Sequence, residues 1–245
     1  MTRSRVRLAL ATGATLLATA AATLLGGTAA SAAPAGLQGQ DVSSYQGNVN
    51  WSAQWSAGSR FAYIKATEGT YYTNPYFAQQ YNGSYNVGMI RGSYHFARPD
   101  TTTGAAQADY FVAHGGGWSK DGRTLPGALD IEYNPYGATC YGKTQSAMRS
   151  WITSFVNEYH AKTTRWPVLY TTTDWWNTCI GSYNAWASES PLWIARYAST
   201  VGTLPPGYSV YSFWQWTSSG TLAGDSDVWN GTLDRLKVLA CNGSC

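Results

Sequence analysis

The segment GALDIE at 127–132 is the part of the sequence that decides the fold class. It is a short apolar run that ends in two carboxylates, Asp130 and Glu132. Four other segments share this design, an apolar run with a polar or aromatic end: FAYIK at 61–65, GSYHF at 92–96, VLYT at 168–171 and WIARY at 193–197. Short apolar runs of this kind are typical of strands buried on both faces of a parallel sheet.

Helices are expected between these strands in the first half of the chain. The clearest is 143–160, where Trp151, Phe155 and Tyr159 recur at every fourth residue and mark a core-facing side. We expect strands at 37–43, 61–65, 89–96, 125–132, 167–171, 192–197 and 211–217, and helices at 51–57, 74–85, 104–114 and 143–160. This alternation predicts an α/β fold: a single modified TIM-like (β/α) barrel of roughly eight strands, with helices missing or short in the second half.

The N-terminal segment has the features of a secretory signal peptide. Arg3, Arg5 and Arg7 precede an apolar run at 8–25, and the small residues at 30–32 resemble a cleavage site. A membrane anchor is the alternative, but the run is rich in Ala and Thr and ends at Gly26–Gly27. We therefore expect residues 1–32 to be removed, a short segment at 33–36, one catalytic domain at 37–245, and a secreted, extracellular protein.

Composition excludes several classes of protein. Hydrophobic residues make up 44% of the chain, which is too many for a disordered protein, and only one long apolar stretch is present. Without the three arginines of the signal segment, acidic and basic residues are equal in number and the basic ones are scattered. No nucleic-acid partner is expected, and no membrane contact after cleavage. The 12 Trp and 18 Tyr against 6 Phe indicate an aromatic-lined groove in addition to a core.

Four cysteines, at 140, 179, 241 and 245, favour disulfides in a secreted chain. Three pairings are possible. We favour Cys140–Cys179 and Cys241–Cys245, because the last two lie too near the terminus to reach far. Their spacing, with no histidine nearby, is a poor metal pattern, so no metal site is expected.

The Asp130–Ile131–Glu132 triplet is the sharpest chemical feature. Residues i and i+2 of a strand share a face, about 6.6 Å apart at Cα, so both carboxylates emerge together while Ile131 turns toward the helices. Each carboxylate disfavours ionisation of the other, and an acid beside a carboxylate is what glycoside hydrolysis requires. Alternatively, the two residues merely cap the next helix or face water. No Gly-x-Ser-x-Gly elbow and no Gly-rich phosphate loop offers a competing chemistry.

The chain resembles glycoside hydrolase family 25, the Chalaropsis-type lysozymes. The resemblance rests on ordered blocks along nearly the whole chain after 37: GQDVSSYQGNVNW at 39–51, FAYIKATEG at 61–69, GSYHFARP at 92–99, LPGALDIE at 125–132, PVLYTTTDWW at 167–176, PLWIARY at 191–197, FWQWTSSG at 213–220 and GDSDVWNG at 224–231. It implies a modified barrel that cleaves the β-1,4 bond between N-acetylmuramic acid and N-acetylglucosamine in peptidoglycan, with no cofactor and with the monomer as the default state.

The resemblance also places the family's catalytic carboxylates on four residues: Asp41, Asp130, Glu132 and Asp225. Asp227, where the family often has Asn, is the alternative to Asp225. Glu132 is then the general acid, and Asp130 orients the N-acetyl group of the substrate in a substrate-assisted route. Five aromatic residues are candidates for stacking on sugars, with barrel packing as the alternative: Tyr94, Tyr170, Trp193, Tyr197 and Trp216.

Two other functions remain open at this point. A non-catalytic barrel could use the same cleft to bind glycans, although intact carboxylates at all four positions argue against it. A related hydrolase could act on chitin, because the N-acetyl group is common to both polymers.

Overall fold

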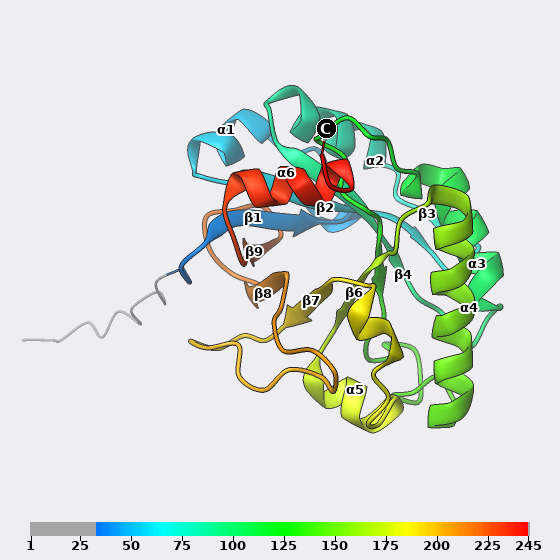
Figure 1. The fold of residues 1–245 in the computed structure, drawn as a ribbon. Helices are drawn as coiled ribbons and strands as arrows, with labels where there is room; N and C mark the ends of the chain where they lie inside the picture. Colours follow the sequence, from blue (N-terminus) through cyan, green and yellow to red (C-terminus); the bar gives the residue numbers. More distant parts are fainter. Residues whose placement is uncertain (1–32, 245) are drawn as a thin grey trace, which may run out of the picture. The chain divides into compact units, whose positions relative to one another are not determined.

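The computed structural model of the protein describes residues 33–244, and the expected signal peptide at 1–32 lies outside that range (Figure 1). Eight strands form a closed ring in the order β1-β2-β4-β5-β6-β7-β8-β9, and β9 pairs back onto β1. Their bounds are β1 Leu37–Val42, β2 Phe61–Glu68, β4 Ile90–Phe96, β5 Ala128–Asp130, β6 Val168–Thr171, β7 Leu192–Ala195, β8 Phe213–Thr217 and β9 Asp225–Trp229. The short β3, Tyr72–Thr73, pairs with β2 outside the ring. The predicted modified barrel is confirmed.

Seven of the ring strands run parallel, but β9 is antiparallel to both of its neighbours, β8 and β1. The sequence prediction missed this strand. β9 turns Asp225, Asp227 and Trp229 into the barrel, so its inner face is largely polar. A segment with this pattern lacks the apolar run of the other strands and is not predicted to be a strand. The antiparallel direction places the first residue of β9, Asp225, at the same end of the barrel as the last residues of the parallel strands.

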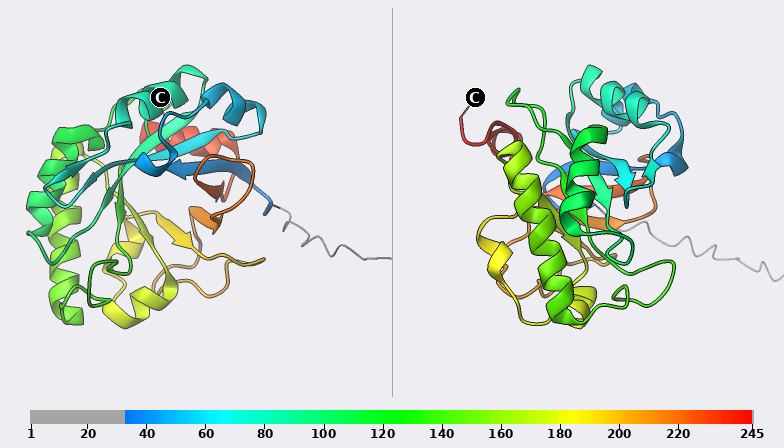
Figure 2. Two further views of the ribbon diagram at one scale, coloured as in Figure 1. Left: turned by 180° about the vertical axis from the view of Figure 1, so that it is seen from behind. Right: turned by 90° about the vertical axis from the view of Figure 1, so that its right-hand side faces the viewer.

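The helices are unevenly distributed around the ring. They are α1 Trp51–Ser56, α2 Phe77–Asn86, α3 Gly104–Phe111, α4 Gln145–Thr163, α5 Thr173–Cys179 and α6 Leu233–Cys241, with short turns η1 Ser44–Gln46, η2 Val112–Gly116 and η3 Ala185–Ser188. The longest, α4, lies alongside α3 on the outside of the barrel (Figure 2). Gly104 permits this approach, because a Cβ there would collide with the backbone of Trp151 and Phe155. None of the described helices is long and apolar enough to cross a membrane.

The second half of the barrel has shorter helices, as predicted. After α4, β6 is followed by α5 of 7 residues and the short turn η3, and β9 by α6 of 9 residues; within the described residues no helix follows β7 or β8. Neither α5 nor α6 was among the predicted helices. Elsewhere the predicted bounds were too wide for some elements and too narrow for others, since β2 extends to Glu68 and α4 to Thr163. The strand expected at 125–132 is regular only over Ala128–Asp130, and the helix expected from 74 begins at Phe77.

Strand alternation divides the core into two layers. Inside the ring lie aromatic side chains such as Phe61, Tyr63 and Phe213, which contact one another edge to face or tilted. Outside the ring, Leu129 and Ile131 pack under α3 and α4 with Phe155. The predicted outward turn of Ile131 is confirmed, because this side chain is fully buried in the outer layer. The aromatic residues inside the ring fill the barrel below its carboxyl-terminal rim.

Candidate active site

A pocket of about 240 Å³ opens at the carboxyl-terminal rim of the barrel. Its lining comes from most of the ring strands and from η1: Asp41, Ser43, Tyr45, Gln46, Lys65, Tyr94, Phe96, Asp130, Glu132, Tyr170, Trp193, Gln215, Gly224 and Asp225. All four carboxylates expected from the sequence are in this set. The arrangement therefore brings together acidic groups that are up to 184 positions apart in the chain, with aromatic rings between them.

Asp130 and Glu132 enter the pocket from the end of β5. Asp130 is 6% exposed, and its Oδ1 is buried without a hydrogen-bond partner among the described residues. Burial, followed by the negative charge of Glu132, raises the pKa of Asp130 well above its ordinary value. Burial also raises the pKa of Glu132, to about 7, with Asp225 adding to the rise and Lys65 opposing it. The pair therefore retains a proton near neutral pH, and its titration is shared.

Asp41 and Asp225 face each other across the β1–β9 pairing. Gln215 of β8 donates a 2.7 Å hydrogen bond from Nε2 to Asp41 Oδ2, and the hydroxyl of Tyr197 donates to Asp225 Oδ2 at 3.3 Å. Burial, followed by the charge of Asp225, raises the pKa of Asp41 to about 8. Burial raises the pKa of Asp225 as well, against the hydrogen bond from Tyr197. Burial therefore favours the protonated forms of the carboxyl groups on this wall of the pocket as well.

Asp227, the alternative to Asp225, is not a lining residue. It is fully buried, and its Oδ1 accepts a 2.8 Å hydrogen bond from the indole Nε1 of Trp193. Its Oδ2 is buried without a hydrogen-bond partner among the described residues, and burial, followed by the negative charge of Asp41, raises the pKa of Asp227 well above its ordinary value. Burial therefore favours the protonated, neutral form of Asp227. This residue packs inside the barrel against Trp193 and does not line the pocket.

The five candidate stacking residues are not equivalent. Tyr94, Tyr170 and Trp193 line the pocket, with the rings of Tyr170 and Trp193 4.8 Å apart and nearly perpendicular. Tyr197 is 57% exposed and reaches the site through its hydroxyl group, which also bonds Gln215. Trp216 is outside the lining set and packs against the apolar cluster of Leu192, Ile194, Trp214 and Val228. Three of the five therefore have rings placed to meet a ligand in the pocket.

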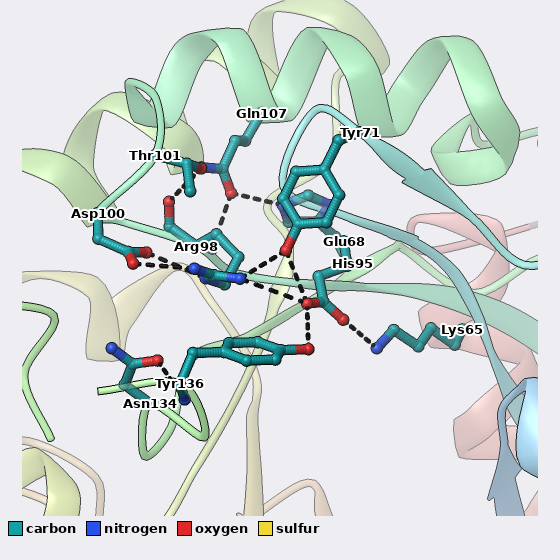
Figure 3. Close-up of polar contacts among 10 residues, drawn as sticks. All are labelled: Lys65, Glu68, Tyr71, His95, Arg98, Asp100, Thr101, Gln107, Asn134 and Tyr136. Atoms are coloured by element: carbon teal, nitrogen blue, oxygen red, sulfur yellow. Dashed lines mark hydrogen bonds and ion pairs between the residues drawn. The ribbon is translucent and has the colours of Figure 1, made fainter. Parts of the chain in front are cut away.

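Lys65 is a lining residue that the sequence analysis did not select. Its Nζ lies 2.7 Å from Glu68 Oε2 (Figure 3). The same atom lies 4.7 Å from the ring centre of Phe96. On β2 it follows Phe61 and Tyr63 at intervals of two, and both of those rings lie in the barrel core. The period of two could therefore have identified Lys65 as an inward-facing residue. It provides a positive charge within the acidic pocket.

His95 ends an apolar run but faces away from the pocket. It is fully buried between Thr67, whose hydroxyl lies 2.7 Å from Nδ1, and Gln107, whose Oε1 lies 2.9 Å from Nε2. Burial lowers the pKa of His95 to about 4, so the ring is neutral near neutral pH. It is therefore part of the outer core. No group of three His, Cys, Asp or Glu side chains within residues 33–244 is arranged to hold a metal ion.

The predicted disulfide between Cys140 and Cys179 is confirmed. It connects the loop that follows Glu132 to the end of α5. Cys245 lies outside the described residues, and the pairing of Cys241 with Cys245 stays a prediction. The Cys140–Cys179 bond anchors the loop that carries Tyr133 and Tyr136 beside the pocket.

Comparison with known proteins adds independent evidence. The model of the family described as Glycosyl hydrolases family 25 matches residues 40–225. Lysozyme M1 from Streptomyces globisporus is 52% identical over 212 residues, which cover 84% of this chain and 72% of that protein. An N,O-diacetylmuramidase from Chalaropsis sp is 51% identical over 208 residues, covering 83% and 99%. The structure of a muramidase from Acremonium alcalophilum matches with a TM-score of 0.83 and 56% identity, covering 84% of this chain and 99% of that one.

Proposed function

The chain belongs to glycosyl hydrolase family 25 and is a lysozyme that hydrolyses peptidoglycan, and we propose that Glu132 and Asp130 carry its chemistry. The bond cleaved is the β-1,4 link between N-acetylmuramic acid and N-acetylglucosamine. One observation carries the proposal. Two carboxyl groups leave β5 together in a pocket of aromatic rings, and burial holds the pKa of Glu132 at about 7.

Glu132 is the general acid. A carboxyl group with a pKa of about 7 keeps its proton at mildly acidic pH and releases it readily to a departing oxygen. Glu132 protonates the glycosidic oxygen as the bond from that oxygen to the anomeric carbon breaks. The ionised carboxylate then accepts a proton from the water that completes hydrolysis.

Asp130 positions the nucleophile, which is the carbonyl oxygen of the substrate's own N-acetyl group. Its buried, unpartnered Oδ1 is an acceptor that the N–H of this group can satisfy. That hydrogen bond favours the ionised form of Asp130, so the proton shared by the pair is left on Glu132. The carbonyl oxygen attacks the anomeric carbon, and the positive charge on the resulting ring lies next to the Asp130 carboxylate. Water then opens this ring, so that the configuration is retained.

Asp41 and Asp225 adjust charge and hydrogen bonding on the opposite wall. Their contacts with Gln215 and Tyr197 fix both carboxyl groups in place. Tyr94, Tyr170 and Trp193 offer apolar ring surface to the sugars. The protein acts without a cofactor, as a secreted monomer whose residues 1–32 have been removed.

Identification of the new reducing end tests the bond assignment. Peptidoglycan digested by the protein is reduced with borohydride, and the product sugar is analysed after acid hydrolysis. We expect reduced muramic acid, because the bond broken is the one on the anomeric carbon of N-acetylmuramic acid. Reduced glucosamine, or faster release of ends from chitin than from peptidoglycan, would contradict the assignment.

The glycan-binding alternative is tested by wall turbidity. Wild type is expected to clear the suspension, whereas Glu132→Gln is expected to bind walls without clearing them. Binding without clearing by both proteins would indicate a lectin.

A further inference from the structure

Two exposed tyrosine residues, Tyr71 and Tyr136, approach the buried carboxylate of Glu68 from opposite sides, and their hydroxyl groups meet at it (Figure 3). They are 56% and 62% exposed. Both hydroxyl groups donate to the same oxygen, Glu68 Oε1, at 2.9 and 2.8 Å. Exposed side chains are usually free to rotate, so two of them bonded to one buried carboxylate form a preorganised surface. We refer to Tyr71, Tyr136, Glu68 and Arg98 as the tyrosine platform.

Arg98 completes the platform. Its Nη1 donates to the Tyr71 hydroxyl at 2.6 Å, and its guanidinium carbon lies 4.2 Å from the ring centre of Tyr136. Asp100 holds the guanidinium group in turn with two hydrogen bonds, of 3.0 and 2.9 Å. The platform therefore joins three separate segments: the end of β2, the loop after β4 and the loop after β5. Such a framework orders the rings without burying them.

The platform is continuous with the pocket through Lys65. This residue lines the pocket, and its Nζ bonds the second oxygen of Glu68. The pocket, of about 240 Å³, is small compared with a polymer, so a glycan strand that is cut inside it must continue along the adjoining surface. On the Lys65 side, that surface is the platform.

The charges of the platform favour a neutral ligand. Lys65 and Arg98 are balanced by Glu68 and Asp100, which pair with them. Burial works against ionisation of Glu68, but the hydrogen bond and the charge of Lys65 hold its pKa below the ordinary value. The hydrogen bond from Arg98 lowers the pKa of Asp100. Both acids are thus ionised at neutral pH, and no net charge is left to attract an acidic peptide.

We propose that the tyrosine platform binds sugar rings of the glycan strand outside the cleaved pair. A pyranose ring presents an apolar face edged with hydroxyl groups, and tyrosine rings with fixed orientation match such a face. The inference rests on the proposed function, because it takes the strand in the pocket to be the substrate. It predicts that the enzyme prefers long glycan strands to short ones, and that Tyr71 and Tyr136 set this preference.

The test compares kcat/KM on two substrates, long peptide-free glycan strands and a tetrasaccharide, by release of reducing ends. In Tyr71→Ala/Tyr136→Ala we expect the ratio of long to short to fall about tenfold, or about 1.4 kcal/mol. Tyr71→Phe/Tyr136→Phe keeps both rings but removes the hydroxyl groups that hold them to Glu68, and is expected to lose part of the preference, less than the alanine variant. Tyr110→Ala, on α3, is the matched control and is expected to keep the wild-type ratio. Tyr136→Ala alone, which removes one exposed ring, covers the case in which the double variant does not fold.

Three outcomes would overturn the platform as a sugar-binding site. These are an unchanged ratio in the alanine variants, an equal loss on both substrates, and a loss seen only on strands that still carry peptides. The last outcome would indicate that the platform binds peptides. None of them affects the proposed function, which fails instead if wild type releases no reducing ends from either substrate.

Discussion

Replacement of Glu132 by Gln should make the protein more stable at alkaline pH. In the folded state the pKa of Glu132 is about 7, against an ordinary value of 4.5. Between these values the folded state binds more protons than the unfolded state, so the free energy of unfolding falls as pH rises from 4.5 to 7. The shift of about 2.5 units, at 1.36 kcal/mol per unit, amounts to about 3 kcal/mol. Glutamine cannot ionise and avoids this loss.

The assay is urea unfolding of wild type and Glu132→Gln at pH 4 and pH 8, with the disulfide intact. We expect wild type to lose about 3 kcal/mol more than the variant between these two pH values. Glu189→Gln makes the same substitution at an exposed position and serves as the matched control. Equal losses in wild type and Glu132→Gln would refute the reasoning, because Glu132 would then ionise as in an unfolded chain and could not hold a proton for catalysis.

Three other substitutions test the surroundings of the site. Gly224→Ala should lower the free energy of unfolding by about 1–3 kcal/mol and reduce turnover, measured by urea titration and reducing-end assays. The reason is that φ at Gly224 is +77° and a Cβ there would collide with the carbonyl oxygen of Asp41. Cys140→Ala/Cys179→Ala should lower the free energy of unfolding by about 4 kcal/mol, because the chain-entropy model gives this value for two cysteines 39 positions apart. Urea unfolding measures the loss, and unchanged stability would contradict the prediction. Asp227→Asn should lose less turnover than Asp225→Asn in reducing-end assays, because Asp227 does not line the pocket and an amide oxygen can still accept the indole hydrogen bond. The opposite order would make Asp227 the fourth catalytic carboxylate.

Much of the barrel could be predicted because its parallel strands are apolar on both faces. GALDIE and FAYIK stand out for this reason, and the outward turn of Ile131 follows from alternation alone. β9 could not be recognised in the same way, since its inward residues are two aspartates and one tryptophan. An apolar pattern marks a strand only when its buried face is apolar, and here that face carries the chemistry.

The site itself was predicted less evenly than the fold. Asp130 and Glu132 were selected from the spacing along one strand, Asp41 and Asp225 were selected by resemblance, and all four converge on one pocket. Trp216 was selected for its chemical type, but alternation along β8 turns Gln215 inward and Trp216 outward. Lys65 was passed over although the same alternation places it inside. The placement of Asp225 opposite Asp41 depends on the register of β9 against β1, which no local pattern in the sequence reveals.

Turnover of Glu132→Gln on peptidoglycan tests the central claim most directly. The measurement is reducing-end release as a function of pH, combined with binding of the same protein to cell walls. The side chain keeps its shape but has no proton to give, so we expect walls to be bound and turnover to fall by a factor of about 100 to 10,000. In wild type, activity should decline as pH rises through about 7, where Glu132 loses its proton. Near-normal turnover by Glu132→Gln, with the same alkaline decline, would show that another residue is the acid.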